Sequence, residues 1–131
     1  MKSGHIDATN SGKIYRTLQL RKSSAVLLLT SKQGIIVHDA ETNTKTNLAR
    51  EQHPSCGVLF GDNLLYFYDQ YCKTIIALCL PLDKKIVSST VIDDVVSLAL
   101  NASGTILSAG TTTGCILLFD ACTLKELNRV A

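Results

Sequence analysis

Short apolar runs separated by turn residues make up most of the chain, and none of them shows the spacing of an amphipathic helix. The runs are rich in Val, Ile and Leu, and Gly, Asn, Asp or Ser lies between them. This pattern is typical of short strands joined by hairpin turns. It predicts strands over residues 24–30, 35–38, 57–60, 64–68, 74–80, 95–100, 105–109 and 115–119. The segment 124–130 is short and uncapped, and it can equally form a strand. The sequence therefore predicts an all-β chain of consecutive antiparallel hairpins.

The hairpins repeat along the chain. A shift of 81 residues places IIVHDAETNTKTN (35–47) over ILLFDACTLKELN (116–128), with identical Ile, Asp, Ala, Thr and Asn residues. The apolar run at 75–80 begins 40 residues after the first copy and 41 before the second. A period of about 40 residues, with four short strands in each unit, is typical of the blades of a β-propeller.

The stretch LSAGTTTGCILLFDACTLKEL (107–127) resembles a WD40 repeat. A polar turn closes on Gly114, and the next apolar run ends in Phe119-Asp120, where the family typically has Trp-Asp. The segment SKQGIIVHD (31–39) is similar, with His38 in the aromatic position. The resemblance covers about residues 24–131 and implies an all-β fold of about three four-stranded antiparallel blades. The residues that define the repeat are Gly34, Asp39, Gly114, Phe119 and Asp120.

The sequence also departs from the family pattern. No Gly-His pair opens any unit, and Thr113 occupies a position where many WD40 repeats have a turn Asp. In the family these residues join a buried hydrogen-bond network that holds each blade together. We therefore expect this network to be absent or incomplete here.

The repeat length divides the chain into a basic N-terminal strand or arm at 1–23 and blades at 24–50, 51–91 and 92–131. Propellers commonly close with four to eight blades, so about three blades leave two apolar faces open. We therefore expect an incomplete propeller that is completed by further chain or by a partner protein, with self-association as another route. An unrelated all-β sandwich with coincidental repeats is the alternative fold.

Composition narrows the class of protein. Hydrophobic residues make up 46% and charged residues 18% of the chain, which is too apolar for a disordered protein. The apolar runs are far shorter than the roughly 20 residues of a membrane-spanning helix, and no apolar stretch follows Lys2 to form a signal peptide. The five cysteines are an odd number, so we expect reduced thiols and an intracellular location, in the cytoplasm or nucleus.

Charge is unevenly distributed although the net charge is only +2. Residues 1–24 carry five basic residues against Asp7, which gives this segment a charge of +4. Such a segment can contact nucleic acid or an acidic protein face, or can simply be solvated loop and edge-strand charge. The candidate contact residues are Lys13, Arg16, Arg21 and Lys22.

Nothing in the sequence indicates a catalytic or metal site. The cysteines form no C-x-x-C pair, no serine lies in a G-x-S-x-G turn, and no glycine-rich phosphate loop precedes a helix. Asp93 and Asp94 are adjacent, so their side chains cannot converge in an extended segment, and we expect a solvated turn. We therefore expect no catalytic residues, no cofactor, no metal and no small-molecule substrate.

The aromatic run Tyr66-Phe67-Tyr68 has two interpretations. Exposed aromatics beside basic residues can stack on single-stranded nucleic acid, but the nearby charges are Asp62, Asp69 and Lys73. Strand alternation instead favours Tyr66 and Tyr68 packing on a neighbouring blade, with Phe67 on the other face. The sequence thus predicts a non-catalytic WD40-like scaffold or adaptor within a larger complex. The alternative is an RNA- or nucleic-acid-associated subunit that uses the basic N-terminal segment.

Overall fold

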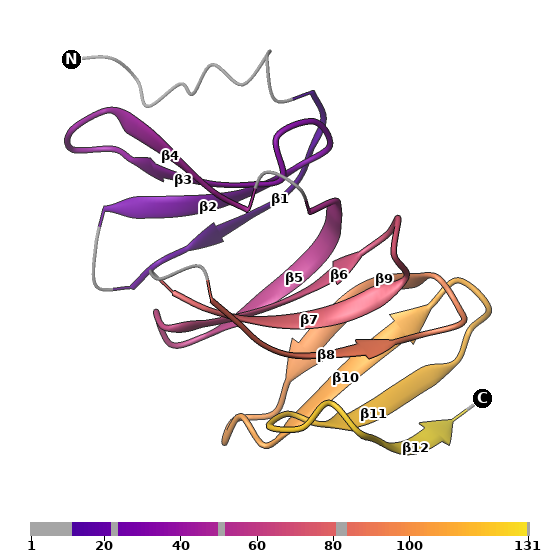
Figure 1. The fold of residues 1–131 in the computed structure, drawn as a ribbon. Coiled ribbons are helices and arrows are strands. Elements are labelled where there is room, and N and C mark those ends of the chain that lie inside the picture. Colours follow the sequence, from indigo (N-terminus) through magenta and orange to yellow (C-terminus); the bar gives the residue numbers. More distant parts are fainter. Residues whose placement is uncertain (1–11, 22–23, 50–51, 81–83, 131) are drawn as a thin grey trace.

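A computed structural model describes residues 12–21, 24–49, 52–80 and 84–130, and within these ranges the chain forms three four-stranded antiparallel sheets (Figure 1). The first sheet consists of β1 (Ile14–Gln19), β2 (Ala25–Thr30), β3 (Ile35–Asp39) and β4 (Thr44–Ala49). The second consists of β5 (Pro54–Phe60), β6 (Leu64–Asp69), β7 (Thr74–Cys79) and β8 (Lys84–Thr90). The third consists of β9 (Val95–Leu100), β10 (Ile106–Thr111), β11 (Ile116–Asp120) and β12 (Glu126–Val130).

The three sheets are stacked in chain order. Strand β5 lies against β1 and β2 of the first sheet and against β9 of the third. The first strand of every sheet is therefore on the same side of the molecule, and the other strands follow outward in sequence order, as in propeller blades (Figure 1). This arrangement confirms the predicted all-β fold of three four-stranded blades.

The eight strands predicted from apolar runs are all present, and the segment 124–130 contains the strand β12. Two strands were not predicted, namely β4 and β8, because their sequences TKTNLA and KKIVSST contain no continuous apolar run. Strand β1 lies within the segment 1–23 and pairs with β2. The first sheet therefore extends across the boundary that the repeat length placed at residue 24.

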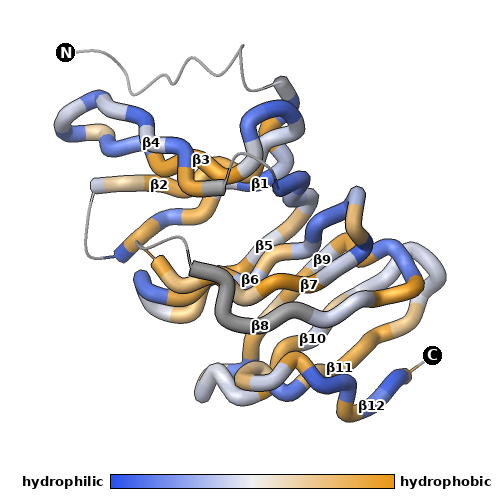
Figure 2. Tube along the Cα trace, viewed as in Figure 1, coloured by the Kyte–Doolittle hydropathy of each residue, from blue (hydrophilic) through white to orange (hydrophobic). Residues whose placement is uncertain are grey.

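Two apolar cores lie between the sheets, and the middle strands supply most of them (Figure 2). Phe67 belongs to the core between the first and second sheets, whereas Tyr66 and Tyr68 belong to the core between the second and third. Their alternation confirms the predicted packing of the aromatic run between blades. It also excludes the run as an exposed stacking platform, since all three side chains are buried.

A buried polar residue ends the second strand of every sheet and closes the turn that follows. The hydroxyl of Thr30 donates to the carbonyl of Gly34, and that of Thr111 donates to the carbonyl of Cys115. In the second sheet Asp69 is at the equivalent position, and its carboxylate accepts hydrogen bonds from the backbone N–H groups of Tyr71 and Cys72. These local bonds close the turns in a sequence that lacks the Gly-His pair and the turn Asp of the WD40 pattern.

Candidate interaction surfaces

One face of the third sheet points away from the second sheet and is accessible to solvent. Two rows of side chains cross this face, as the strand register shows. We define the open face by these eight residues: Ser97, Gly110, Ile116 and Val130 in one row, and Ala99, Ser108, Leu118 and Asn128 in the other. Ile116 is 48% exposed and Val130 is 46% exposed, and Leu118 is half-buried.

The open face carries no charged side chain, and two of its polar side-chain oxygens are bonded within the sheet. The Ser108 hydroxyl donates to the carbonyl of Ala99 at 3.3 Å. The Asn128 side-chain oxygen accepts a hydrogen bond from the backbone N–H of Arg129 at 2.8 Å. A neighbouring molecule can therefore cover this face without leaving these two oxygens unsatisfied, which lowers the cost of burying them.

The outer face of the first sheet is different. Leu28, Ile36 and His38 are on the side of that sheet that points away from the second sheet, and they are only 1%, 2% and 6% exposed. The sequence predicted two open faces, and this part of the prediction is wrong for the central positions of the first sheet. Within this buried face, His38 Nδ1 has no hydrogen-bond partner among the described residues.

A second candidate surface, which is polar and aromatic, lies at the turn between β6 and β7. The rings of His53 and Tyr71 are stacked with centroids 3.8 Å apart and an interplanar angle of 15°. Asp69 holds both residues, because its carboxylate also accepts the backbone N–H of His53 at 3.1 Å. Tyr71 is nevertheless 72% exposed, so this stacked pair presents an aromatic ring at the surface.

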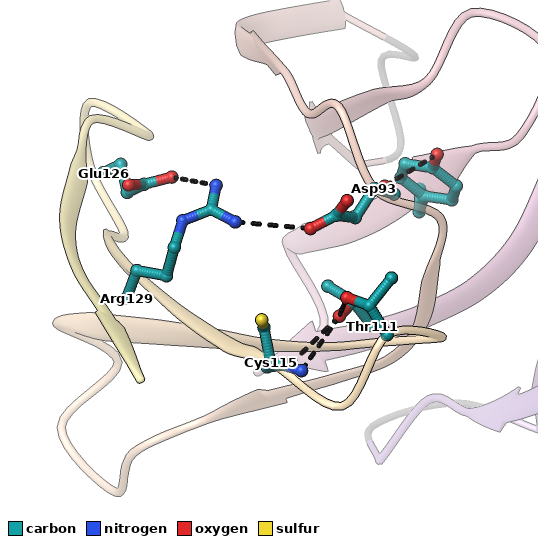
Figure 3. Close-up of polar contacts among 7 residues, drawn as sticks. Asp93, Thr111, Cys115, Glu126 and Arg129 are labelled. Atoms are coloured by element: carbon teal, nitrogen blue, oxygen red, sulfur yellow. Dashed lines mark hydrogen bonds and ion pairs between the residues drawn. The ribbon is translucent and has the colours of Figure 1, made fainter. Parts of the chain in front are cut away.

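Two ion pairs flank the segment that joins the second and third sheets. Lys73 Nζ lies 2.6 Å from Asp94 Oδ1, and this bond raises the pKa of Lys73 and lowers the pKa of Asp94. Arg129 binds Asp93 at 3.2 Å and Glu126 at 3.4 Å, so it ties β12 to the linker before β9 (Figure 3). The segment is exposed to solvent at Ile92 and Asp94, as expected for a solvated turn, and each carboxylate also has a cationic partner. The two carboxylates bind different partners, as expected for adjacent residues that do not converge.

The basic residues of the N-terminal segment do not form one cluster. Lys13 precedes β1 and its Nζ lies 5.1 Å from the centre of the Tyr15 ring, whereas Arg21 follows β1 and its N–H binds Asp62 Oδ1. Eight residues of extended chain separate Lys13 from Arg21 by about 26 Å at roughly 3.3 Å per residue. Arg16 is exposed between them. Lys22 is outside the described residues.

The residues that define the repeat shape the blades. Gly34 and Gly114 have φ angles of 67° and 88°, in the left-handed region that favours glycine, and each closes the turn after a second strand. Asp39 and Asp120 cap the turns after β3 and β11, where Asp39 accepts from Glu41 N and Asp120 from Cys122 N. A hydrogen bond from Ser24 also lowers the pKa of Asp39.

Phe119 is 1% exposed in the core between the second and third sheets. It lies opposite Glu126 in the strand register and shares its core with Tyr66 and Tyr68. The aromatic position that the WD40 resemblance assigned to Phe119 is thus buried between blades. None of the repeat-defining residues contributes a side chain to the open face.

The cysteines and carboxylates show no arrangement for metal binding among the described residues. All five cysteines are free, and burial raises the pKa of the Cys56 thiol to about 11. Within the described ranges there is also no helix long and apolar enough to cross a membrane. Sequence reasoning predicted open faces but did not identify their residues, although the repeat alignment of Ile116 with Ile35 contained a signal for them, and it did not identify the role of Asp69.

No protein-family model matches the sequence, and no curated protein matches it either. The structure is similar to solved β-propellers. It superposes on the WD40 repeats of RRP9 with a TM-score of 0.67 at 16% identity, covering 88% of this chain and 41% of that chain. It superposes on the Cps50 (Swd1) β-propeller domain of Myceliophteria thermophila with a TM-score of 0.74 at 17% identity, covering 91% and 38% of the two chains. It also matches the computationally designed Ika4 protein, with a TM-score of 0.72 at 18% identity, covering 96% and 74%.

These likenesses establish the fold. The three sheets are blades of the WD40 β-propeller type, and the chain spans about two fifths of the RRP9 and Cps50 domains. The chain therefore resembles part of a WD40 propeller.

Proposed function

We propose that this protein is a non-catalytic scaffold that binds other proteins within a larger intracellular assembly, and that one partner completes its partial propeller. The open face carries this proposal. It is neutral, it is apolar at Ile116, Leu118 and Val130, and the Ser108 hydroxyl and the Asn128 side-chain oxygen already have hydrogen-bond partners. An exposed apolar face of this kind marks a site for another macromolecule.

The charge distribution favours a protein over a nucleic acid as the partner. Nucleic acid requires several cations along one surface, because phosphate contacts supply most of the affinity. Here Lys13 and Arg21 are at opposite ends of β1, and Lys73 and Arg129 are each engaged with a carboxylate. A neutral apolar face instead matches the packed centre of a protein–protein interface.

The experiment that tests this function is purification of the protein from its native cells under non-denaturing conditions, followed by measurement of the complex mass. We expect a stable complex with at least one other protein, and we expect its mass to be unchanged by nuclease treatment. The matched variants are Leu118→Asp on the open face and Ile92→Asp, which replaces a residue that is 85% exposed in the linker before β9.

A nucleic-acid function predicts a different result. Binding to a single-stranded RNA would fall steeply with salt, and neutralising Lys13, Arg16 and Arg21 together would reduce the salt dependence. A scaffold for proteins predicts no measurable RNA binding at 150 mM salt with either the original or the neutralised chain. Recovery of the protein only as a monomer would contradict the scaffold function.

A further inference from the structure

The same positions in each blade face the next blade. In the second strands these positions are Leu27 and Leu29 in the first sheet and Tyr66 and Tyr68 in the second, and all four are buried in the cores between sheets. The equivalent positions in the third sheet are Ser108 and Gly110 on the open face. The chain therefore shows twice what covers such a face, and in both cases the cover is a four-stranded antiparallel sheet.

The covering sheets share one chemistry. In the core between the first and second sheets the covering residues are Leu65, Phe67, Ile76 and Leu78. In the core between the second and third sheets they are Leu107, Ala109, Leu117 and Phe119. Each set consists of alternate apolar residues on two neighbouring strands, without a charge. A sheet with this pattern suits the uncharged open face.

The sizes of facing residues compensate one another. The smaller pair Leu27 and Leu29 is covered by a strand with Phe67, whereas the bulky pair Tyr66 and Tyr68 is covered by a strand with Ala109 at the same strand position. Compensation is expected because protein interiors keep a nearly constant packing density. The pair Ser108 and Gly110 is smaller than either, so its cover requires the bulkiest residue at that position.

The space over Gly110 is bounded on its own sheet by Ser97. A side chain at Gly110 would bring its Cβ to 2.7 Å from Ser97 Oγ, so the Ser97 hydroxyl already lies beside the glycine and the face is low at this position because it has no side chain there. We propose that the open face binds a four-stranded β-sheet of a separate protein, and that this sheet places an aromatic side chain over Ser108 and Gly110. This inference rests on the proposed scaffold function and specifies its partner.

The buried face of the first sheet indicates that the partner is a different protein. A second copy of this chain would have to offer a covering face of its own, and the candidate positions on its first sheet, Leu28 and Ile36, are already buried. The covering faces of the second and third sheets are likewise buried in the two cores.

The size rule is tested with a cover of known sequence. The full chain is extended by a second copy of residues 92–130, either unchanged or with Ala109→Phe in the added copy only. The matched control places Ser108→Phe in the added copy, which puts the same aromatic group on the opposite face of the same strand. We expect the Ala109→Phe version alone to raise the urea midpoint above that of the unchanged extension. Equal midpoints for the two phenylalanine versions, or no increase with either, would overturn the size rule.

The source of the partner is tested in cells with p-benzoyl-phenylalanine in place of Ile116, on the open face. We expect a photo-adduct with a strand of a different protein that contains an aromatic residue in an alternating apolar pattern. We expect this adduct to fall at least tenfold with Leu118→Asp and to be retained with Ile92→Asp. An adduct with a second copy of this chain, or with another segment of the same polypeptide, would overturn the proposal.

The two proposals fail in distinguishable ways. If partner proteins copurify equally with the original chain and with Leu118→Asp, the scaffold function stands and the docking proposal is overturned. If no protein copurifies with the original chain, the scaffold function itself is overturned, together with the inference that rests on it.

Discussion

The hydrogen bond from Tyr66 to Ala121 joins the second and third blades, and its removal gives a sharp test of the packing between them. The Tyr66 hydroxyl donates to the carbonyl of Ala121 at 2.7 Å, and both residues are only 2% exposed. Tyr68 lies two residues along the same strand and faces the same core, but its hydroxyl lies 3.4 Å from the carbonyl of Asp93, at the upper limit for a hydrogen bond. The two tyrosines therefore form a matched pair that differs in the length of this carbonyl bond, while the Tyr68 hydroxyl also interacts with the half-exposed Asp94 carboxylate.

We expect Tyr66→Phe to lower the free energy of unfolding by about 1–2 kcal/mol, because it removes a net contribution of about 1 kcal/mol and leaves a buried carbonyl unsatisfied. We expect Tyr68→Phe to lower it by less than about 0.5 kcal/mol, since the longer bond contributes little. The assay is urea unfolding followed by circular dichroism, with the slope of free energy against urea checked for constancy between variants.

Thermal unfolding supplies a second measure of the same difference. A loss of 1 kcal/mol corresponds to a fall in Tm of roughly 3–6 °C for a domain of this size. Equal losses for the two variants, or a larger loss for Tyr68→Phe, would show that the 2.7 Å bond does not join the blades in the way described. Both variants keep the aromatic ring in the core, so loss of packing does not confuse the comparison.

Four further predictions concern single residues. His38 aligns with Phe119 in the repeat, so His38→Phe places an aromatic side chain at the equivalent position. This change is expected to raise the free energy of unfolding by about 1 kcal/mol, because it removes an unpaired buried nitrogen. A lower free energy of unfolding in urea would contradict this. Asp69→Ala is expected to lower the free energy of unfolding by about 3 kcal/mol, since three backbone N–H groups lose their acceptor. Asp69→Asn keeps one acceptor oxygen and is expected to lower the free energy of unfolding by less in the same assay. Gly57→Ala is expected to lower the free energy of unfolding by about 1–2 kcal/mol, because the new Cβ would lie 3.0 Å from a backbone carbonyl oxygen. An unchanged urea midpoint would refute this steric argument. Burial raises the pKa of Cys56 from 9.0 to about 11, which is expected to slow its alkylation at pH 8 about 100-fold relative to an unperturbed thiol, as measured by mass spectrometry of peptides after timed labelling. The stability that depends on the protonated thiol is fully present below about pH 9 and is lost as the pH rises through 11.

Local pattern was sufficient to predict the middle strands of each blade. Those strands are buried on both faces, so their sequences are nearly continuous apolar runs, as in Thr74–Cys79. The outer strands β4 and β8 escaped prediction because their sequences are mostly polar, and their place depends on pairing with a neighbouring strand. The same holds for Asp69, which the sequence shows only as an acidic residue after an aromatic run. Its role depends on a turn and on His53, which is 16 residues away.

The sequence by itself determined the strand alternation, the repeat of about 40 residues and the absence of a recognisable catalytic motif, because these depend on residues close together in the chain. It also placed Tyr66 and Tyr68 on one face, since alternation along a strand is a local property. Only the tertiary structure decided which faces are covered. Leu28 on the first sheet and Ile116 on the third are both apolar strand residues, yet one is buried and the other is half exposed. Burial depends on what packs above a residue, and the sheet that covers it comes from a distant part of the chain or from another protein.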